Sequence, residues 1–184
     1  DVAEAARRAA AAQPEWAATS FEERAAVLRR AADLLDERRE YVIGWLVRET
    51  GEIRARATHE TRISAGEIRE AAGLAGQPFG ELLPTTERGR LSFAQRVPLG
   101  VVGAITPWNA PVILGLRVIA PALALGNAVV IKPDAQTPIT GGLLLASILE
   151  EAGLPDGLLH ALPRAAEAGQ AMVTDPNIAL ISFT

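Results

Sequence analysis

Apolar and polar residues in the first part of the chain alternate with the period of an α-helix. The alanine-rich residues 1–13 predict a first helix, which Pro14 is expected to end. A second helix is predicted to begin at Ser20, because Ser20 and Glu23 have the spacing of a capping box. Its apolar positions keep helical spacing until shortly before Gly51, the expected C-terminal cap.

The next segment shows no strong strand pattern. A third helix is predicted over residues 53–75, and the Gly and Pro residues that follow it indicate an irregular link. A short extended segment is expected over residues 90–95. We therefore expect residues 1–96 to form a helical region with a short extended link.

The pattern changes at Val97, where short continuous apolar runs begin to alternate with helical segments. Such runs are typical of the buried strands of a parallel sheet that is covered on both faces. The expected fold class is therefore α/β, with N-terminal helices followed by a Rossmann-like parallel sheet and flanking helices. Strands are predicted at residues 101–105, 128–131, 158–162 and 178–183, and helices at 112–125, 139–152 and 165–173.

Composition narrows the class of protein further. The 18 basic and 22 acidic residues are interspersed, which disfavours a nucleic-acid partner. No apolar run approaches the roughly 20 residues that span a bilayer, so we expect no membrane association and a cytoplasmic location. The chain has no cysteine and only two isolated histidines, His59 and His160, so no protein-bound metal is expected.

Two loops after predicted strands carry the candidate chemistry, because ligands of open parallel sheets bind at the carboxyl ends of the strands. Thr106-Pro107-Trp108-Asn109 follows the first strand. Asn109 either presents its side-chain amide at this edge or caps the helix that follows. Trp108 either lies at the same edge or belongs to the core.

Lys132 and Pro133 follow the second strand. The ammonium group of Lys132 can bind a ribose hydroxyl or a phosphate. Alternatively, Lys132 is simply a solvated residue at the end of the strand.

The run from Val97 to Pro138 resembles the start of the cofactor domain of the aldehyde dehydrogenase superfamily. The resemblance is carried by Pro107-Trp108-Asn109, and by Gly126-Asn127 before the apolar strand that leads to Lys132-Pro133. It implies that Asn109 stabilises the oxyanion formed when a thiolate attacks an aldehyde. It also implies that Trp108 lies beside the nicotinamide, that Thr106 and Pro107 belong to the cofactor site, and that Lys132 binds the adenosine ribose.

The chain also departs from the family pattern. Asp134-Ala135 replaces the common Ser-Glu after Lys-Pro, and Asp134 could accept a hydrogen bond from a ribose 2′-hydroxyl and repel a 2′-phosphate. We therefore expect NAD, with NADP left open. The glycine-rich loop of the family is reduced here to Gly169. Phe183 and Thr184 precede the point where the family opens a phosphate-binding helix.

The resemblance implies NAD(P)-dependent oxidation of an aldehyde to a carboxylic acid, in a parent protein that we expect to be a homodimer or homotetramer. The Lys-Pro-Asp variant is similar to benzaldehyde dehydrogenase-like members, which favours an aromatic aldehyde. The family's nucleophilic cysteine and general-base glutamate are not among these residues, so we expect an incomplete part of the enzyme. One alternative is an inactive nucleotide-binding or assembly fragment, and another is a semialdehyde-specific or acylating member of the superfamily.

The remaining titratable residues are not expected to act in catalysis. Glu49, Glu67 and Glu70 are predicted to be exposed helix charges, and His59 and His160 are predicted to be structural.

Overall fold

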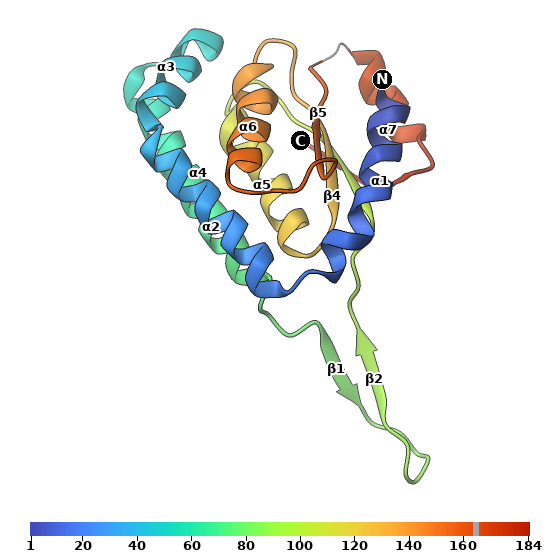
Figure 1. The fold of residues 1–184 in the computed structure, drawn as a ribbon. Helices are drawn as coiled ribbons and strands as arrows, with labels where there is room; N and C mark the ends of the chain where they lie inside the picture. Colours follow the sequence, from blue (N-terminus) through green and yellow to red (C-terminus); the bar gives the residue numbers. More distant parts are fainter. Residues whose placement is uncertain (164–165) are drawn as a thin grey trace.

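The computed structural model describes residues 1–163 and 166–184, which form a layered α/β domain from which one hairpin projects (Figure 1). The first four helices are α1 (Val2–Ala18), α2 (Phe21–Glu37), α3 (Arg39–Thr50) and α4 (Arg54–Leu74). The sheet consists of β3 (Val101–Ile105), β4 (Ala128–Lys132), β5 (Leu159–Ala161) and β6 (Ile178–Phe183). Its covering helices are α5 (Pro111–Ala124), the π-helical turn η1 (Ile139–Leu143), α6 (Leu144–Glu151) and α7 (Ala166–Thr174).

Two predicted helix boundaries in the first part are wrong. Pro14 lies inside α1, which continues for four further residues because Trp16 is buried and donates from Nε1 to the Leu123 carbonyl at 2.9 Å. The long second helix is interrupted at Arg38, where the backbone leaves helical geometry between α2 and α3. The capping box of Ser20 with Glu23 is confirmed.

The end of α3 is as predicted. Gly51 follows it in the left-handed conformation with φ of 71°, and its N–H donates to the Val47 carbonyl, so the predicted glycine cap is confirmed.

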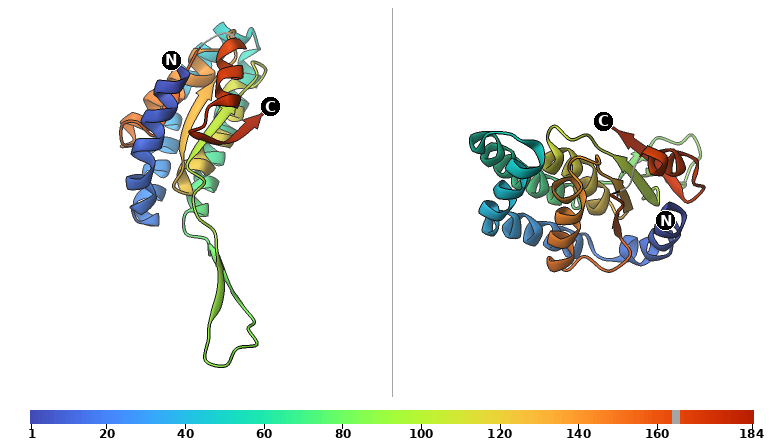
Figure 2. Two further views of the ribbon diagram at one scale, coloured as in Figure 1. Left: turned by 90° about the vertical axis from the view of Figure 1, so that its right-hand side faces the viewer. Right: turned by 90° about the horizontal axis from the view of Figure 1, so that it is seen from above.

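The link after α4 is more regular than predicted. Strands β1 (Gly80–Leu83) and β2 (Ser92–Gln95) pair in antiparallel fashion, with Gly80 opposite Gln95. Figures 1 and 2 show this hairpin extending away from the body, on the side where β3 begins. The extended segment predicted at residues 90–95 is the second strand of that hairpin.

The four-stranded sheet is parallel throughout, with the order β5-β4-β3-β6. This confirms the predicted fold class. Helices α5 and α6 cover one face, and α1 and α7 cover the other (Figure 2). Helices α2 and α4 pack on the outside of α5 and α6 and form a fourth layer. The helix predicted at residues 165–173 corresponds to α7, although residue 165 lies outside the described residues.

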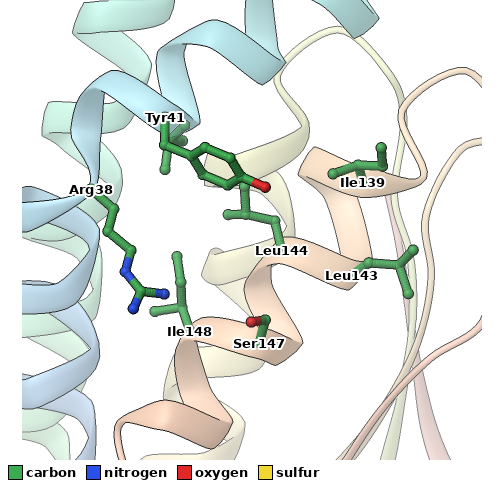
Figure 3. Close-up of a pocket in the computed structure, with 8 residues that line it drawn as sticks. Arg38, Tyr41, Ile139, Leu143, Leu144, Ser147 and Ile148 are labelled. Carbon is green, nitrogen blue, oxygen red and sulfur yellow. The ribbon is translucent and has the colours of Figure 1, made fainter.

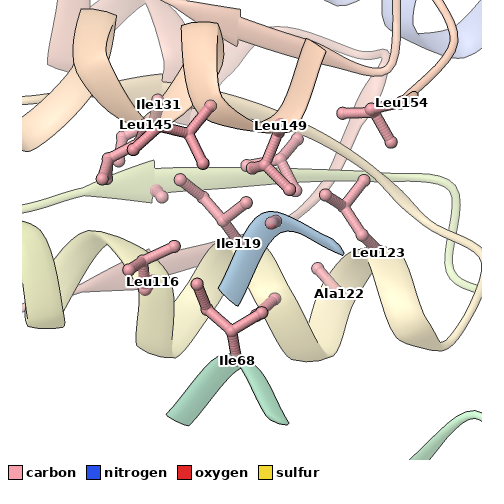
Figure 4. Close-up of a cluster of buried hydrophobic side chains, with 14 of the residues drawn as sticks. Ile68, Leu116, Ile119, Ala122, Leu123, Ile131, Leu145, Leu149 and Leu154 are labelled. Carbon is pink, nitrogen blue, oxygen red and sulfur yellow. The ribbon is translucent and has the colours of Figure 1, made fainter. Parts of the chain in front are cut away.

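The main core fills the space between α4, α5, α6 and the sheet (Figure 4). Its largest fully buried side chains include Ile68, Ile119, Leu123, Ile131 and Leu149. Removing such apolar surface from water is the dominant favourable contribution to folding. The division into a helical region up to residue 96 and a cofactor domain from residue 97 stays a prediction. Helix α1 of the first region packs against the sheet of the second.

Gly126 and Asn127 make the tight turn from α5 into β4. Gly126 has φ of 82°, and a Cβ there would lie 3.2 Å from the Ala17 Cα. The buried Asn127 accepts from the N–H groups of Leu99 and Gly100 through Oδ1, at 2.7 and 3.1 Å. This motif is therefore structural, and it lies at the amino ends of β3 and β4.

None of the helices in residues 1–163 and 166–184 is both long enough and apolar enough to cross a membrane.

Candidate active site

The carboxyl ends of three strands meet at one edge of the sheet. Ile105 at the end of β3 pairs with Lys132 of β4 on one side and with Phe183 of β6 on the other. The chain runs from β3 outward through β4 to β5 and then returns to the opposite side of β3. The switch point of the sheet therefore lies between β3 and β6, the place where open α/β sheets bind their ligands.

The loop after β3 brings the predicted residues to this edge. Thr106 is buried, and its N–H donates to the Lys132 carbonyl at 3.2 Å, which ties the loop to the neighbouring strand. Trp108 is 48% exposed, so it is not a core residue of this chain. Beside Trp108 and Asn109 lies a hollow of about 320 Å³, whose other lining residues are Thr50, Gly51, Glu52 and Arg56.

Asn109 does not cap α5. The N-cap residue is Ala110, and it makes no side-chain capping hydrogen bond. Within the described parts of the chain, the exposed Asn109 side chain makes no hydrogen bond, whereas its backbone carbonyl accepts one from Arg56 Nη2 at 2.7 Å. The capping alternative is therefore wrong, and the amide is available to a ligand.

The side chain of Glu60, from α4, accepts the hydrogen bonds that an N-cap side chain would otherwise accept. Its Oε1 accepts from the N–H groups of Val112 and Ile113, at 2.9 and 3.3 Å, although Glu60 is only 3% exposed. Burial raises the pKa of Glu60 to about 6, and nearby Glu52 adds to this rise, while the two N–H groups and Arg56 oppose it. Sequence reasoning missed Glu60, because its partner helix lies 50 residues away.

Glu49 plays the same part at the neighbouring helix. Its two carboxylate oxygens accept from the N–H groups of Ile139 and Thr140, at 2.9 and 2.7 Å, and from the Thr140 hydroxyl at 2.6 Å. The prediction that Glu49 is an exposed helix charge is therefore wrong. The N-termini of α5 and η1, which could otherwise attract an anion, are both occupied by carboxylates of the protein.

Glu67 and Glu70, the other two glutamates predicted to be exposed helix charges, lie on the helix surface. Glu67 pairs with Arg117 at 3.3 Å, and Glu70 is exposed.

Lys132 is the last residue of β4, and Asp134 lies in the loop that follows. Lys132, the only lysine of the chain, is half-buried at the strand end and makes no ion pair with a described residue. Asp134 shapes the loop: its Oδ1 accepts from the Gln136 N–H at 2.8 Å, and its carbonyl accepts from the Thr137 N–H at 3.1 Å. An aspartate turn of this kind leaves the second carboxylate oxygen without a partner in the loop.

The last three predicted residues lie around the end of β6. Gly169 is inside α7, and a Cβ at this position would be in ordinary contact with Ile105 Cδ1, at 3.6 Å. Phe183 is 77% exposed, and the Thr184 N–H donates to the Ile105 carbonyl at 3.1 Å. These residues therefore lie beside β3, across from Lys132.

A second hollow, of about 190 Å³, lies between α3 and α6 (Figure 3). Arg38 and Tyr41 line it on the side of α3. The residues on the side of η1 and α6 include Ile139, Leu143, Leu144 and Ile148. None of the residues predicted from the sequence to bind or react lines it, so it is not the candidate active site. Among residues 1–163 and 166–184, no three His, Asp or Glu side chains are grouped so that they could hold a metal ion.

The proteins that this chain resembles in sequence and fold are named as aldehyde-oxidising dehydrogenases. The chain is 54% identical to a vanillin dehydrogenase of Amycolatopsis sp. and 52% identical to a benzaldehyde dehydrogenase [NAD(+)] of Pseudomonas putida. Both matches cover 100% of this chain and 38% of the relative. The crystal structure of an NAD-dependent benzaldehyde dehydrogenase from Corynebacterium glutamicum superposes with a TM-score of 0.95 and 44% identity, over 100% of this chain and 40% of that one.

The chain thus spans well under half the length of these relatives. The model of the aldehyde dehydrogenase family matches residues 1–184, and the chain therefore belongs to the aldehyde dehydrogenase family.

Proposed function

We propose that the protein carrying this chain oxidises an aromatic aldehyde to a carboxylic acid with NAD, and that these residues supply its oxyanion donor and one wall of its cofactor site. The observation that carries the proposal is the Asn109 side-chain amide, which follows the carboxyl end of β3 beside the switch point of the sheet and has no hydrogen-bond partner among the described residues. The substrate class rests on the relatives, which are named for vanillin and benzaldehyde.

Asn109 would act on the tetrahedral oxyanion that forms when a nucleophile attacks the aldehyde carbonyl. An amide N–H held in place before the reaction stabilises that charge without having to reorganise. The chain contains no cysteine, so a thiolate nucleophile cannot come from these 184 residues. The residues at hand would orient the carbonyl oxygen, and the attacking group would come from another part of the protein.

The edge of the sheet also fits a dinucleotide. Lys132 would bond ribose hydroxyls, Trp108 would lie near the nicotinamide, and Thr106, Pro107, Gly169, Phe183 and Thr184 would line the crevice between β3 and β6. NAD supplies the hydride acceptor when it is bound. The half-buried ammonium of Lys132 supports this assignment, because it is not already paired with a described carboxylate.

Asp134 favours NAD over NADP in this proposal. One of its oxygens is held by the Gln136 N–H, and the other can accept a hydrogen bond from a 2′-hydroxyl. A 2′-phosphate at the same place would meet a like charge. Asp134→Ala should therefore narrow the difference between the affinities for NAD and NADP.

The proposal has two further parts. We infer a cytoplasmic location and a homodimeric or homotetrameric parent, as expected from the sequence resemblance. A semialdehyde-specific or acylating member of the family would use the same Asn109 and Lys132, so the substrate distinguishes these possibilities.

The first test is calorimetric titration of the chain with NAD and with NADP. We expect NAD to bind more tightly, and Lys132→Ala to weaken NAD at least tenfold, or about 1.4 kcal/mol. Gln136→Ala is the matched control, because Gln136 is exposed on the same loop. Equal NAD affinities for the native chain and Lys132→Ala would refute the role of Lys132.

The second test measures benzaldehyde oxidation by the complete protein that carries this chain. Asn109→Ala should lower kcat by about 10²–10³, the usual cost of losing one oxyanion donor. A complete protein that reduces NAD with short aliphatic semialdehydes but not with benzaldehyde or vanillin would overturn the aromatic assignment.

A further inference from the structure

We propose that Arg56 and Glu60 of α4 are positioning residues for Asn109, and that together they hold the turn between β3 and α5 from two sides. The inference rests on the proposed function, in which the Asn109 amide stabilises the oxyanion. It assigns part of the active-site geometry to the N-terminal helices, which contribute no residue to the predicted site.

Arg56 holds the turn at Asn109 itself. Its Nη2 donates to the Asn109 backbone carbonyl at 2.7 Å, and its Nε lies 2.9 Å from Glu52 Oε2. The Glu52 side chain is only 7% exposed, so one end of the guanidinium contacts a buried carboxylate while the other reaches the loop. This contact restrains the peptide that follows Asn109, and hence the backbone from which its side chain projects.

Glu60 holds the turn from the other side. It lies one helical turn beyond Arg56 on α4 and accepts from the N–H groups of Val112 and Ile113 in the first turn of α5. A carboxylate at a helix N-terminus is stabilised by the helix dipole. The two hydrogen bonds to Glu60 therefore restrain both the position and the orientation of the first turn of α5. Asn109 is thus joined to α4 both at its own carbonyl and three residues further along.

The loop has few other restraints. The Thr106 N–H bonds β4 at the start of the loop, but neither Trp108 nor Asn109 makes a side-chain hydrogen bond within the described parts of the chain. An oxyanion donor must lie 2.7–3.1 Å from its target, and a displacement of about 1 Å can cost about 10²-fold in rate. The two contacts from α4 therefore restrain the loop where such accuracy is needed.

The variants separate positioning from general stability. Arg56→Met removes the contact with the Asn109 carbonyl, and Arg56→Lys keeps the charge but cannot bridge to both Glu52 and the loop. Glu60→Ala removes the anchor, whereas Glu60→Gln keeps an acceptor oxygen. Arg62→Met and Glu70→Gln serve as controls, because Arg62 and Glu70 are exposed on the same helix and make no hydrogen bond or ion pair with the described residues of the loop or of α5.

The experiment measures kcat and KM for the aldehyde, and Kd for NAD, in the complete protein. Arg56→Met and Glu60→Ala should lower kcat at least tenfold while Kd for NAD stays within twofold. Arg56→Lys should be intermediate, Glu60→Gln should recover most of the kcat lost in Glu60→Ala, and both controls should stay within twofold of the native protein. Hydrogen exchange of residues 106–116 should be faster in Arg56→Met and Glu60→Ala than in either control.

If kcat of Arg56→Met and Glu60→Ala matches that of the controls, the inference is overturned. A loss of kcat accompanied by an equal loss of NAD affinity would also overturn it, since this indicates general disruption of the fold. A native protein that oxidises no aldehyde would refute the proposed function instead. Hydrogen exchange then decides the inference alone: faster exchange in the two variants supports the restraint, and unchanged exchange overturns it.

Discussion

The buried Glu60 carboxyl should make the chain less stable as the pH rises from about 4.5 to 6, and Glu60→Gln should remove this dependence. Its pKa rises from 4.5 to about 6, chiefly because of burial. The folded chain therefore binds more protons at Glu60 than the unfolded chain does in this window. The contribution to the free energy of unfolding is complete below pH 4.5 and lost as the pH passes 6.

The magnitude follows from the two pKa values. A difference between 4.5 and about 6, at about 1.4 kcal/mol per pKa unit, corresponds to about 2 kcal/mol. Solvent screening should reduce it little, because Glu60 is 3% exposed. Oε1 accepts both N–H groups, while Oε2 is buried and has no partner among the described residues, so the proton can lie on Oε2 without breaking either contact.

Urea unfolding of the native chain and of Glu60→Gln between pH 4 and pH 7.5 measures the effect. The stability of the variant relative to the native chain should increase by about 2 kcal/mol across the window. Glu70→Gln is the matched control, since Glu70 is exposed on the same helix. A difference for Glu60→Gln that stays constant with pH would refute the reasoning, and one of opposite sign would mean that the helix N-terminus outweighs burial.

Two further predictions concern the scaffold. Asn127→Ala should lower the free energy of unfolding by about 1–3 kcal/mol in urea titrations, because it leaves the N–H groups of Leu99 and Gly100 without their acceptor. An unchanged free energy of unfolding would show that water replaces the amide. Leu123→Ala should cost about 2–5 kcal/mol by the same measurement, since Leu123 is fully buried in α5 at the centre of the core, and a cost below 1 kcal/mol would contradict the packing described.

Much of the sheet could be predicted because its signals are local. Each strand is a short apolar run, and the turn from α5 into β4 contains its own signal, Gly126, whose φ is 82°. The errors occur where a distant contact overrides a local preference. Pro14 remains inside α1 because the helix continues as far as the buried Trp16. The break at Arg38 has neither a glycine nor a proline to signal it, and Arg38 instead pairs with Glu151 of α6.

The loops of the site were predictable from motif and strand order, whereas their supports were not. Asn109 lies in the loop after one predicted strand and Lys132 directly follows another, and parallel strands bring their carboxyl ends to one edge. Glu49 and Glu60 belong to a polar helical segment in which exposed charge is the usual prediction. Only the packing of α3 and α4 against η1 and α5 reveals that these carboxylates contact helix N-termini.

The positions of these carboxylates explain how the N-terminal helices are connected to the sheet edge. Each of the two helices that leave the edge begins with N–H groups that have no partner within the helix. Water or an anionic ligand could satisfy them, but here Glu60 satisfies those of α5 and Glu49 those of η1. These N–H groups are therefore not open to the phosphates of the proposed dinucleotide. The same contacts join α3 and α4 to the segments that follow Asn109 and Lys132.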